Sequence, residues 1–245
     1  KIEFDNPDLD GSVEGKTYSP KQEFIDVFEK LVVEKLRTDS RTTEEIERTK
    51  LPYYRVLLGK SNDFIRNNVI EYGMTKFDEV NSLAPDFQPE DKVDLYCFYN
   101  MRKHYFSSYS IFESYPEFFI PQFLSTSGRV TFMDFGCGPL TSGLAFNQVF
   151  KQRLENLKFN YLGIDISNAM LAKAKEFGKT SLFSNVRNQQ FINKFQDRDE
   201  SLLNEWFTYP NIVILNFSYL FSNLTQEEVR ELADKLKKNA KDLRM

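Results

Sequence analysis

Histidine, cysteine and tryptophan are scarce in this chain of 245 residues, which has one His, two Cys and one Trp. A single imidazole excludes a metal site built from several histidines, and two cysteines are too few for a disulfide framework or a cysteine-rich metal site. We therefore expect no bound metal and a reducing compartment, the cytoplasm. The chemistry of the protein therefore does not rest on a cluster of histidines or cysteines.

Long apolar stretches are also missing. The chain has no run of about 18 apolar residues, the length that a membrane-spanning helix requires. The acidic, polar N-terminus lacks the pattern of a secretory signal peptide. We therefore expect no membrane partner. Because the chain begins at Lys1 rather than Met, we expect that some of the natural N-terminus is missing.

The two halves of the chain differ in glycine content and charge. Only 10 residues are glycine, and six of them lie between Gly128 and Gly178. Residues 1–125 have a formal charge of −7, whereas residues 126–245 have +3. An acidic first half is a poor match for a phosphate backbone, so the charge pattern argues against nucleic acid as a partner without excluding RNA.

Residues 1–125 have helical periodicity and no strand alternation, which predicts an all-α extension. Apolar residues recur at helical spacing from Phe24 to Val32. Three more helices are expected, over residues 42–57, 61–73 and 89–109. Pro116 and Pro121 predict an irregular connection after the last of these helices.

Residues 126–245 alternate β-prone runs with helical segments. Strands are expected at residues 130–134, 161–165, 186–195 and 211–216, with helices at 144–157, 168–177 and from 225 onward. Strands that alternate with helices of this length form right-handed crossovers and a parallel sheet. The predicted fold class is α/β, a Rossmann-like and mostly parallel sheet flanked by helices and preceded by the all-α extension.

The first predicted strand ends in a short glycine-rich turn that contains Asp134, Gly136, Cys137 and Gly138. A strand that enters such a turn before a helix lets the backbone approach a ligand closely, although a purely structural turn is an alternative. The third glycine of a dinucleotide-binding fingerprint would fall at Thr141. The pattern therefore disfavours a pyrophosphate cradle and favours a carboxylate that faces a positively charged ligand.

Asp165 ends the second predicted strand. In an open parallel sheet, a carboxylate at this point accepts the hydroxyl protons of a ribose. The alternative is that Asp165 caps the following helix, although Ser167 or Asn168 can fill that role.

Two segments, VTFMDFGCGPLTSGL (130–144) and YLGIDISNAMLAKAK (161–175), resemble the first two motifs of the class I S-adenosylmethionine-dependent methyltransferases. The resemblance covers roughly residues 128–240 and implies S-adenosylmethionine as the cofactor. It implies that Gly136 and Gly138, with Cys137 between them, lie under the methionine part of the cofactor. It further implies that Asp134 interacts with the amino end of the cofactor.

The same resemblance implies that Asp165 binds the ribose hydroxyls and that Ile166 and Met170 lie near the adenine or the ribose. It also implies that the end of the fourth strand, from Asn216 to Tyr219, is close to the substrate, and we include Asn216 among the cofactor-binding candidates. The alternative is that the aromatic residues of this segment belong to the core and that Asn216 caps the end of the strand. We assign no catalytic residue.

The chain departs from the family pattern at three places. Leu140 stands where family members often have a third glycine, a change that narrows the expected pocket around the methionine part. The usual acidic residue after the third strand is not evident, with Asn193 as the nearest candidate. No strands follow the fourth one, so we expect either a fragment or a missing segment or second chain that completes the sheet.

We therefore predict a helical N-terminal cap and substrate domain at residues 1–125 and an S-adenosylmethionine-binding domain at residues 126–245. The expected function is methyl transfer to an unidentified acceptor, with a small molecule or protein favoured over nucleic acid. The alternatives are a non-catalytic binding or regulatory module, an RNA methyltransferase and, more weakly, a nicotinamide-dependent oxidoreductase. His104, the single histidine, is expected to be a surface or core residue.

Overall fold

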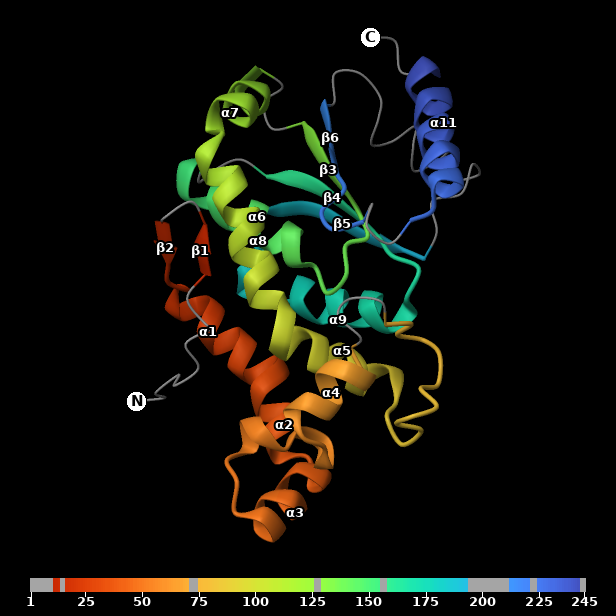
Figure 1. Ribbon diagram of the computed structural model, residues 1–245. Helices are drawn as coiled ribbons and strands as arrows, with labels where there is room; N and C mark the ends of the chain where they lie inside the picture. The colour runs from red at the N-terminus through yellow and green to blue at the C-terminus, as the bar shows by residue number, and fades with distance from the viewer. Residues whose placement is uncertain are drawn as a thin grey trace.

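The computed structural model describes residues 11–13, 16–70, 75–125, 129–154, 158–193, 212–220 and 224–242. Its centre is a four-stranded sheet in the order β5-β4-β3-β6, in which all neighbouring strands are parallel. The strands are β3 (Val130–Phe135), β4 (Phe159–Ile164), β5 (Val186–Ile192) and β6 (Ile212–Asn216). Helices flank this sheet (Figure 1), so the predicted α/β class is confirmed.

Three helices connect or follow the strands, namely α8 (Thr141–Arg153), α9 (Asn168–Gly178) and α11 (Gln226–Asp242). Figure 1 shows α8 and α11 on opposite sides of the sheet. Every residue of β3 and β4 is buried, as expected for central parallel strands that are covered on both faces. Because these strands are parallel, the carboxyl ends of β3, β4 and β6 lie side by side and form one edge of the sheet, the carboxyl edge.

The N-terminal half is mainly helical, as predicted. Its helices are α1 (Gln22–Phe28), α2 (Glu34–Thr38), α3 (Ser40–Thr49), α4 (Asn62–Asn68), α5 (Pro89–Tyr96), α6 (Arg102–Ser114) and α7 (Pro116–Ser125). One π-helical turn, residues 29–33, joins α1 to α2, and another, residues 97–101, joins α5 to α6. Short 3₁₀ turns lie at residues 53–55, 57–59 and 181–183.

The expectation of an all-α extension is wrong at its start. Strands β1 (Gly11–Val13) and β2 (Lys16–Tyr18) pair antiparallel. Each strand has three residues, which is too short for an alternating pattern to be recognised in the sequence. The hairpin is anchored by Tyr18, which donates a hydrogen bond to Ser110 Oγ and packs beside the Phe106 ring.

Two other predicted boundaries are also wrong. The segment after Pro116 is helical, with Pro121 inside α7, because packing of the buried Phe123 ring against Phe150 compensates for the backbone hydrogen bond that proline cannot make. The helix expected to reach residue 57 ends at Thr49. There Lys50 adopts a left-handed conformation (φ +59°) that closes α3.

The larger hydrophobic core contains residues from Phe24 to Phe183 and therefore runs across the proposed domain boundary. A smaller cluster on the other side of the sheet is built on Met133, Phe135, Leu162 and Ile164. The division of the chain at residue 125 stays a prediction, but the helical half and the sheet share one continuous core.

Strand β6 is an outermost strand of the described sheet. Within the described ranges it pairs with β3 alone, and Leu215 on it is 41% exposed. The expectation that a further segment or a second chain completes the sheet stays a prediction. None of the helices in the described part of the chain is both long enough and apolar enough to cross a membrane.

Candidate functional site

The glycine turn lies between β3 and α8, at the edge of the sheet where β3 and β4 end. The backbone N–H groups of Gly136 and Cys137 both donate to the carbonyl oxygen of Ile164, at 2.8 and 3.0 Å. Gly136 and Gly138 have φ angles of +68° and +50°, in the region that favours glycine. These contacts tie the turn to the end of β4 and explain why glycine is needed at both positions.

Asp165 braces this turn from the end of β4. Its Oδ2 accepts a hydrogen bond from the Gly138 N–H at 2.9 Å, and its Oδ1 accepts one from the Ser167 N–H at 2.9 Å. Burial raises the pKa of Asp165, although these two amides partly counteract the shift. The N-cap of α9 is Ser167, whose Oγ accepts a hydrogen bond from the Met170 N–H. Helix capping therefore does not account for Asp165.

Asp134 lies at the carboxyl end of β3 and is 1% exposed. Its carboxylate accepts hydrogen bonds from Tyr161 Oη at 2.8 Å, from Asn216 Nδ2 at 2.7 Å and from the backbone N–H of Gly143. Burial raises the pKa of Asp134 to about 6, even though these hydrogen bonds favour the ionised form. The structure thus brings Asn216 of β6 and Asp134 together, and it shows that both carboxylate oxygens already have partners within the chain.

The remaining predicted site residues differ in exposure. Ile166 is 81% exposed directly after Asp165, whereas Met170 and Cys137 are buried. Burial raises the pKa of the Cys137 thiol well above its usual value, so this thiol is unreactive. Asn193, at the end of β5, donates a hydrogen bond to the Ile166 carbonyl at 2.7 Å. Asn193 thus orients the residue after Asp165 through the backbone.

Leu140, the departure from the family pattern, is fully buried and has a left-handed conformation with φ +74°. Its side chain belongs to the larger core and packs close to Gly143, where a Cβ would lie 2.8 Å from Leu140 Cδ1. By contrast, a Cβ placed on Gly138 would have no atom within 4 Å. The outer side of the turn is therefore open at Gly138.

The first turn of α8 has one unsatisfied side-chain group. The partial positive charge of a helix start favours an anion, and here the Asp134 carboxylate supplies it by accepting a hydrogen bond from the Gly143 N–H. The buried Thr141 Oγ1 has no hydrogen-bond partner within the part of the chain that the structure describes. This hydroxyl lies at the end of α8 next to the glycine turn.

Asp78, from the helical half, was not found by sequence analysis. Its carboxylate accepts hydrogen bonds from Ser167 Oγ (2.8 Å) and from the N–H groups of Asn168 (2.6 Å) and Ala169 (3.1 Å). Burial opposes ionisation, but these three hydrogen bonds outweigh it and lower the pKa of Asp78. No local pattern identifies an aspartate that caps a helix about 90 residues away, so no sequence signal was available.

Two aromatic residues of the helical half also lie at this edge of the sheet. A hydrogen bond of 2.9 Å joins Tyr96 Oη to His104 Nδ1, and the His104 ring stacks on Tyr219 with centroids 4.1 Å apart. Burial raises the pKa of Tyr96, and the negative charge of Asp165 adds to this effect. His104 is half-buried rather than a surface residue, and it contacts the segment that follows β6.

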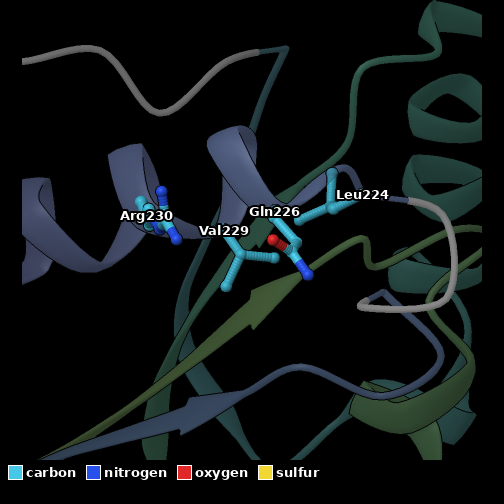
Figure 2. Close-up of a pocket in the computed structure, with 4 residues that line it drawn as sticks. All are labelled: Leu224, Gln226, Val229 and Arg230. Carbon is cyan, nitrogen blue, oxygen red and sulfur yellow. The ribbon is translucent and has the colours of Figure 1, made fainter.

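Other features of the described residues do not suggest a second site. No group of three or more His, Cys, Asp or Glu residues that suits a metal ion occurs among them. An open hollow of about 410 Å³ lies beside the start of α11, where Leu224, Gln226, Val229 and Arg230 line it (Figure 2). None of the predicted site residues lines this hollow.

Comparisons with known proteins add no family assignment. No protein-family model matches the chain, and neither a curated protein nor a solved structure matches it. The similarity to the class I methyltransferases therefore rests on the two sequence motifs.

Proposed function

We propose that the protein is an S-adenosylmethionine-dependent methyltransferase whose cofactor binds at the edge formed by the glycine turn and Asp165. The observation that carries this proposal is the position of the Asp165 carboxylate. This carboxylate accepts hydrogen bonds from the Gly138 N–H, in the turn between β3 and α8, and from the Ser167 N–H, at the start of α9. It therefore lies at the carboxyl ends of two neighbouring parallel strands, β3 and β4. Ligands of open α/β sheets bind at such an edge.

The residues present fit the chemical groups of this cofactor. Gly138 leaves space for close approach of a ligand, and Ile166 offers an exposed apolar surface beside Asp165. Thr141 Oγ1, which has no hydrogen-bond partner among the described residues, can donate to the carboxylate of the amino-acid part. The carboxylates of Asp134 and Asp165 make the edge acidic, which suits a cofactor with a sulfonium and an ammonium group.

The bound cofactor would supply a methyl group made electrophilic by the positive sulfur. Asp165 would accept hydrogen bonds from the ribose hydroxyls while its backbone contacts hold the turn in place. Tyr96 and His104 of α5 and α6 would cover the edge and exclude water. Catalysis would then depend mainly on holding the acceptor in line with the methyl group.

The acceptor is proposed to be a small molecule or a protein group. The acidic helical half, with a formal charge of −7 over residues 1–125, repels a phosphate backbone. RNA is a less favoured acceptor for the same reason.

A binding module without turnover is a second candidate, favoured by one observation. A Cβ on Gly136 would lie 3.1 Å from Leu220 Cδ1, so this leucine covers one side of the turn. A covered turn is compatible with cofactor binding but restricts the path to the methyl group. Release of S-adenosylhomocysteine in the presence of an acceptor would exclude this candidate.

Calorimetry tests the proposed cofactor site. We expect wild type to bind S-adenosylmethionine with micromolar affinity, and we expect Asp165→Ala to bind it about 10- to 100-fold more weakly because hydrogen bonds to a charged group are lost. Asp234→Asn, which changes a carboxylate 78% exposed on α11, is the matched control. Absence of binding to wild type, or equal affinity in the Asp165 variant, would overturn the proposal.

A further inference from the structure

The His104 side chain makes two contacts at this edge of the sheet, one with Tyr219 and one with Tyr96. Helix α6 places it against Tyr219, just after the carboxyl end of β6, and α5 supplies Tyr96 on its Nδ1 side. Phe77 packs edge-on against the Tyr96 ring, at 5.5 Å between centroids. These contacts fix the plane and the position of the only imidazole in the chain.

One nitrogen of this imidazole is left for a ligand. Nδ1 is bonded to Tyr96 Oη, whereas Nε2 has no hydrogen-bond partner in the described ranges of the chain. Burial lowers the pKa of His104, and the positive charge of Lys103 lowers it further. The ring is therefore neutral near pH 7 and can accept a proton.

The backbone of Tyr219 also has an unusual conformation at this point. Its φ is +61°, a left-handed conformation that is unfavourable for an aromatic residue, and its side chain is 50% exposed. Strained residues of this kind cluster at functional sites when the surrounding structure holds them in place. Here the stack on His104 holds the Tyr219 ring at the edge where the fourth strand ends.

Resting on the function proposed above, we propose that His104 Nε2 accepts the proton of a hydroxyl acceptor, a small phenol, that lies beside the stack of His104 and Tyr219. The acceptor oxygen forms the new C–O bond with a lone pair as the C–S bond breaks and its electron pair stays on sulfur. The hydroxyl proton passes to Nε2. Atoms and charge balance, since the sulfonium charge is replaced by the charge of the imidazolium.

The class of acceptor follows from which groups at this edge already have partners. Asp134 is bonded to Tyr161 and Asn216, and Asp78 is bonded to the start of α9. The described residues place no carboxylate in a hydrogen bond or ion pair with His104, so an ammonium acceptor would have no partner beside the imidazole. The aromatic rings and the neutral imidazole suit an uncharged aromatic hydroxyl instead.

Nuclear magnetic resonance of the labelled imidazole tests this inference, because the chain has a single histidine. In wild type at pH 7 we expect the tautomer in which Nδ1–H donates to Tyr96 Oη, so that Nε2 has a free lone pair. The pKa of His104 should be at least about half a unit lower with S-adenosylmethionine bound than with S-adenosylhomocysteine, because only the former has a positive sulfur nearby.

The two proposals fail in different ways. If calorimetry detects neither ligand, the cofactor site and the role of His104 both fall. If both ligands bind to saturation and the pKa of His104 is the same in the two complexes, only the role of His104 is overturned. The opposite tautomer, with the proton on Nε2, overturns it as well.

The acceptor class is tested with 4-methylphenol and, as a matched amine, 4-methylbenzylamine. In the S-adenosylhomocysteine complex, 4-methylphenol should shift the His104 resonances and the amine should not. With S-adenosylmethionine, His104→Gln should lower the rate of methyl transfer to the phenol about 100-fold or more and remove the corresponding step in the pH profile. Asp234→Asn, at the exposed carboxylate on α11, is the control and should retain both. Response to the amine alone would overturn the inference.

Discussion

The two faces of the sheet are built differently. On the face towards α6 and α8, aromatic rings are fully buried and pack closely. The centroid of the Phe146 ring lies 4.2 Å from the ring centroids of both Phe132 and Phe150. On the other face, Met133 and Leu162 pack against Leu232 and Leu236 of α11. These two leucine side chains of α11 are only partly buried. The comparison indicates that the N-terminal helices are part of the main core and that stability is concentrated on their side.

The largest expected effect comes from truncating one ring in the better-packed face. Phe146→Ala should lower the free energy of unfolding by about 3–5 kcal/mol, whereas Leu236→Ala on the other face should lower it by about 1 kcal/mol because that side chain is only partly buried. Urea denaturation of both variants measures the difference. Equal losses would show that the two faces contribute alike.

An ion pair sharpens the comparison, because it joins the helical half to the better-packed face. Lys173 of α9 and Asp94 of α5 are 4% and 6% exposed, and their Nζ and Oδ1 atoms lie 2.6 Å apart. Lys173→Ala should cost about 3 kcal/mol, since it leaves a buried carboxylate with less compensation. Glu176→Gln removes only the 48%-exposed partner of the same lysine and should cost less than about 1 kcal/mol.

If thermal or urea unfolding finds the Lys173 and Glu176 variants equally stable, the pair does not join the two halves energetically. A double variant, Lys173→Met with Asp94→Leu, gives a second check. It should recover much of the lost stability, because no buried charge is left without its partner.

The smallest of these effects is the pH dependence of stability that comes from Asp134, the buried carboxyl group at the carboxyl end of β3. Burial raises its folded-state pKa to about 6, above the value of 3.8 expected for an exposed aspartate. Its neutral form therefore contributes stability below about pH 4, and this contribution is lost as the pH rises through 6. Relative to Asp134→Asn, wild type should lose about 2 kcal/mol of unfolding free energy between pH 4 and pH 7.

Urea titrations of wild type and Asp134→Asn at several pH values measure this difference. The exposed Asp234→Asn variant should follow the wild-type curve throughout. Parallel curves for wild type and the Asp134 variant would mean that Asp134 ionises as it does in the unfolded chain.

The fold could be predicted well where the signal was local. The four strands and α9 follow the sequence pattern closely, because apolar runs and the Ser167 cap act within a few residues. Prediction failed at α7 and at the β1–β2 hairpin. In both places tertiary packing, by Phe123 on Phe150 and by Tyr18 on Phe106, overrides weak or unfavourable local preference.

The candidate site was predicted in part. Sequence analysis placed Asp134, Gly138 and Asp165 at neighbouring strand ends, and the structure brings them to one edge. It predicted that Asp134 would face a ligand, whereas the structure shows its oxygens bonded to Tyr161 and Asn216. The cofactor and the reaction stay predictions.

The sequence by itself determined the order of the strands and helices after residue 128, the parallel connections and the glycine turn, because periodicity and turn chemistry depend on nearby residues. Only the tertiary structure decided that Asp78 caps α9, that Lys173 pairs with Asp94 and that His104 stacks on Tyr219. These pairs lie between about 80 and 115 residues apart in the chain. No local pattern specifies such contacts, because they form only after burial of the shared core brings the two halves together.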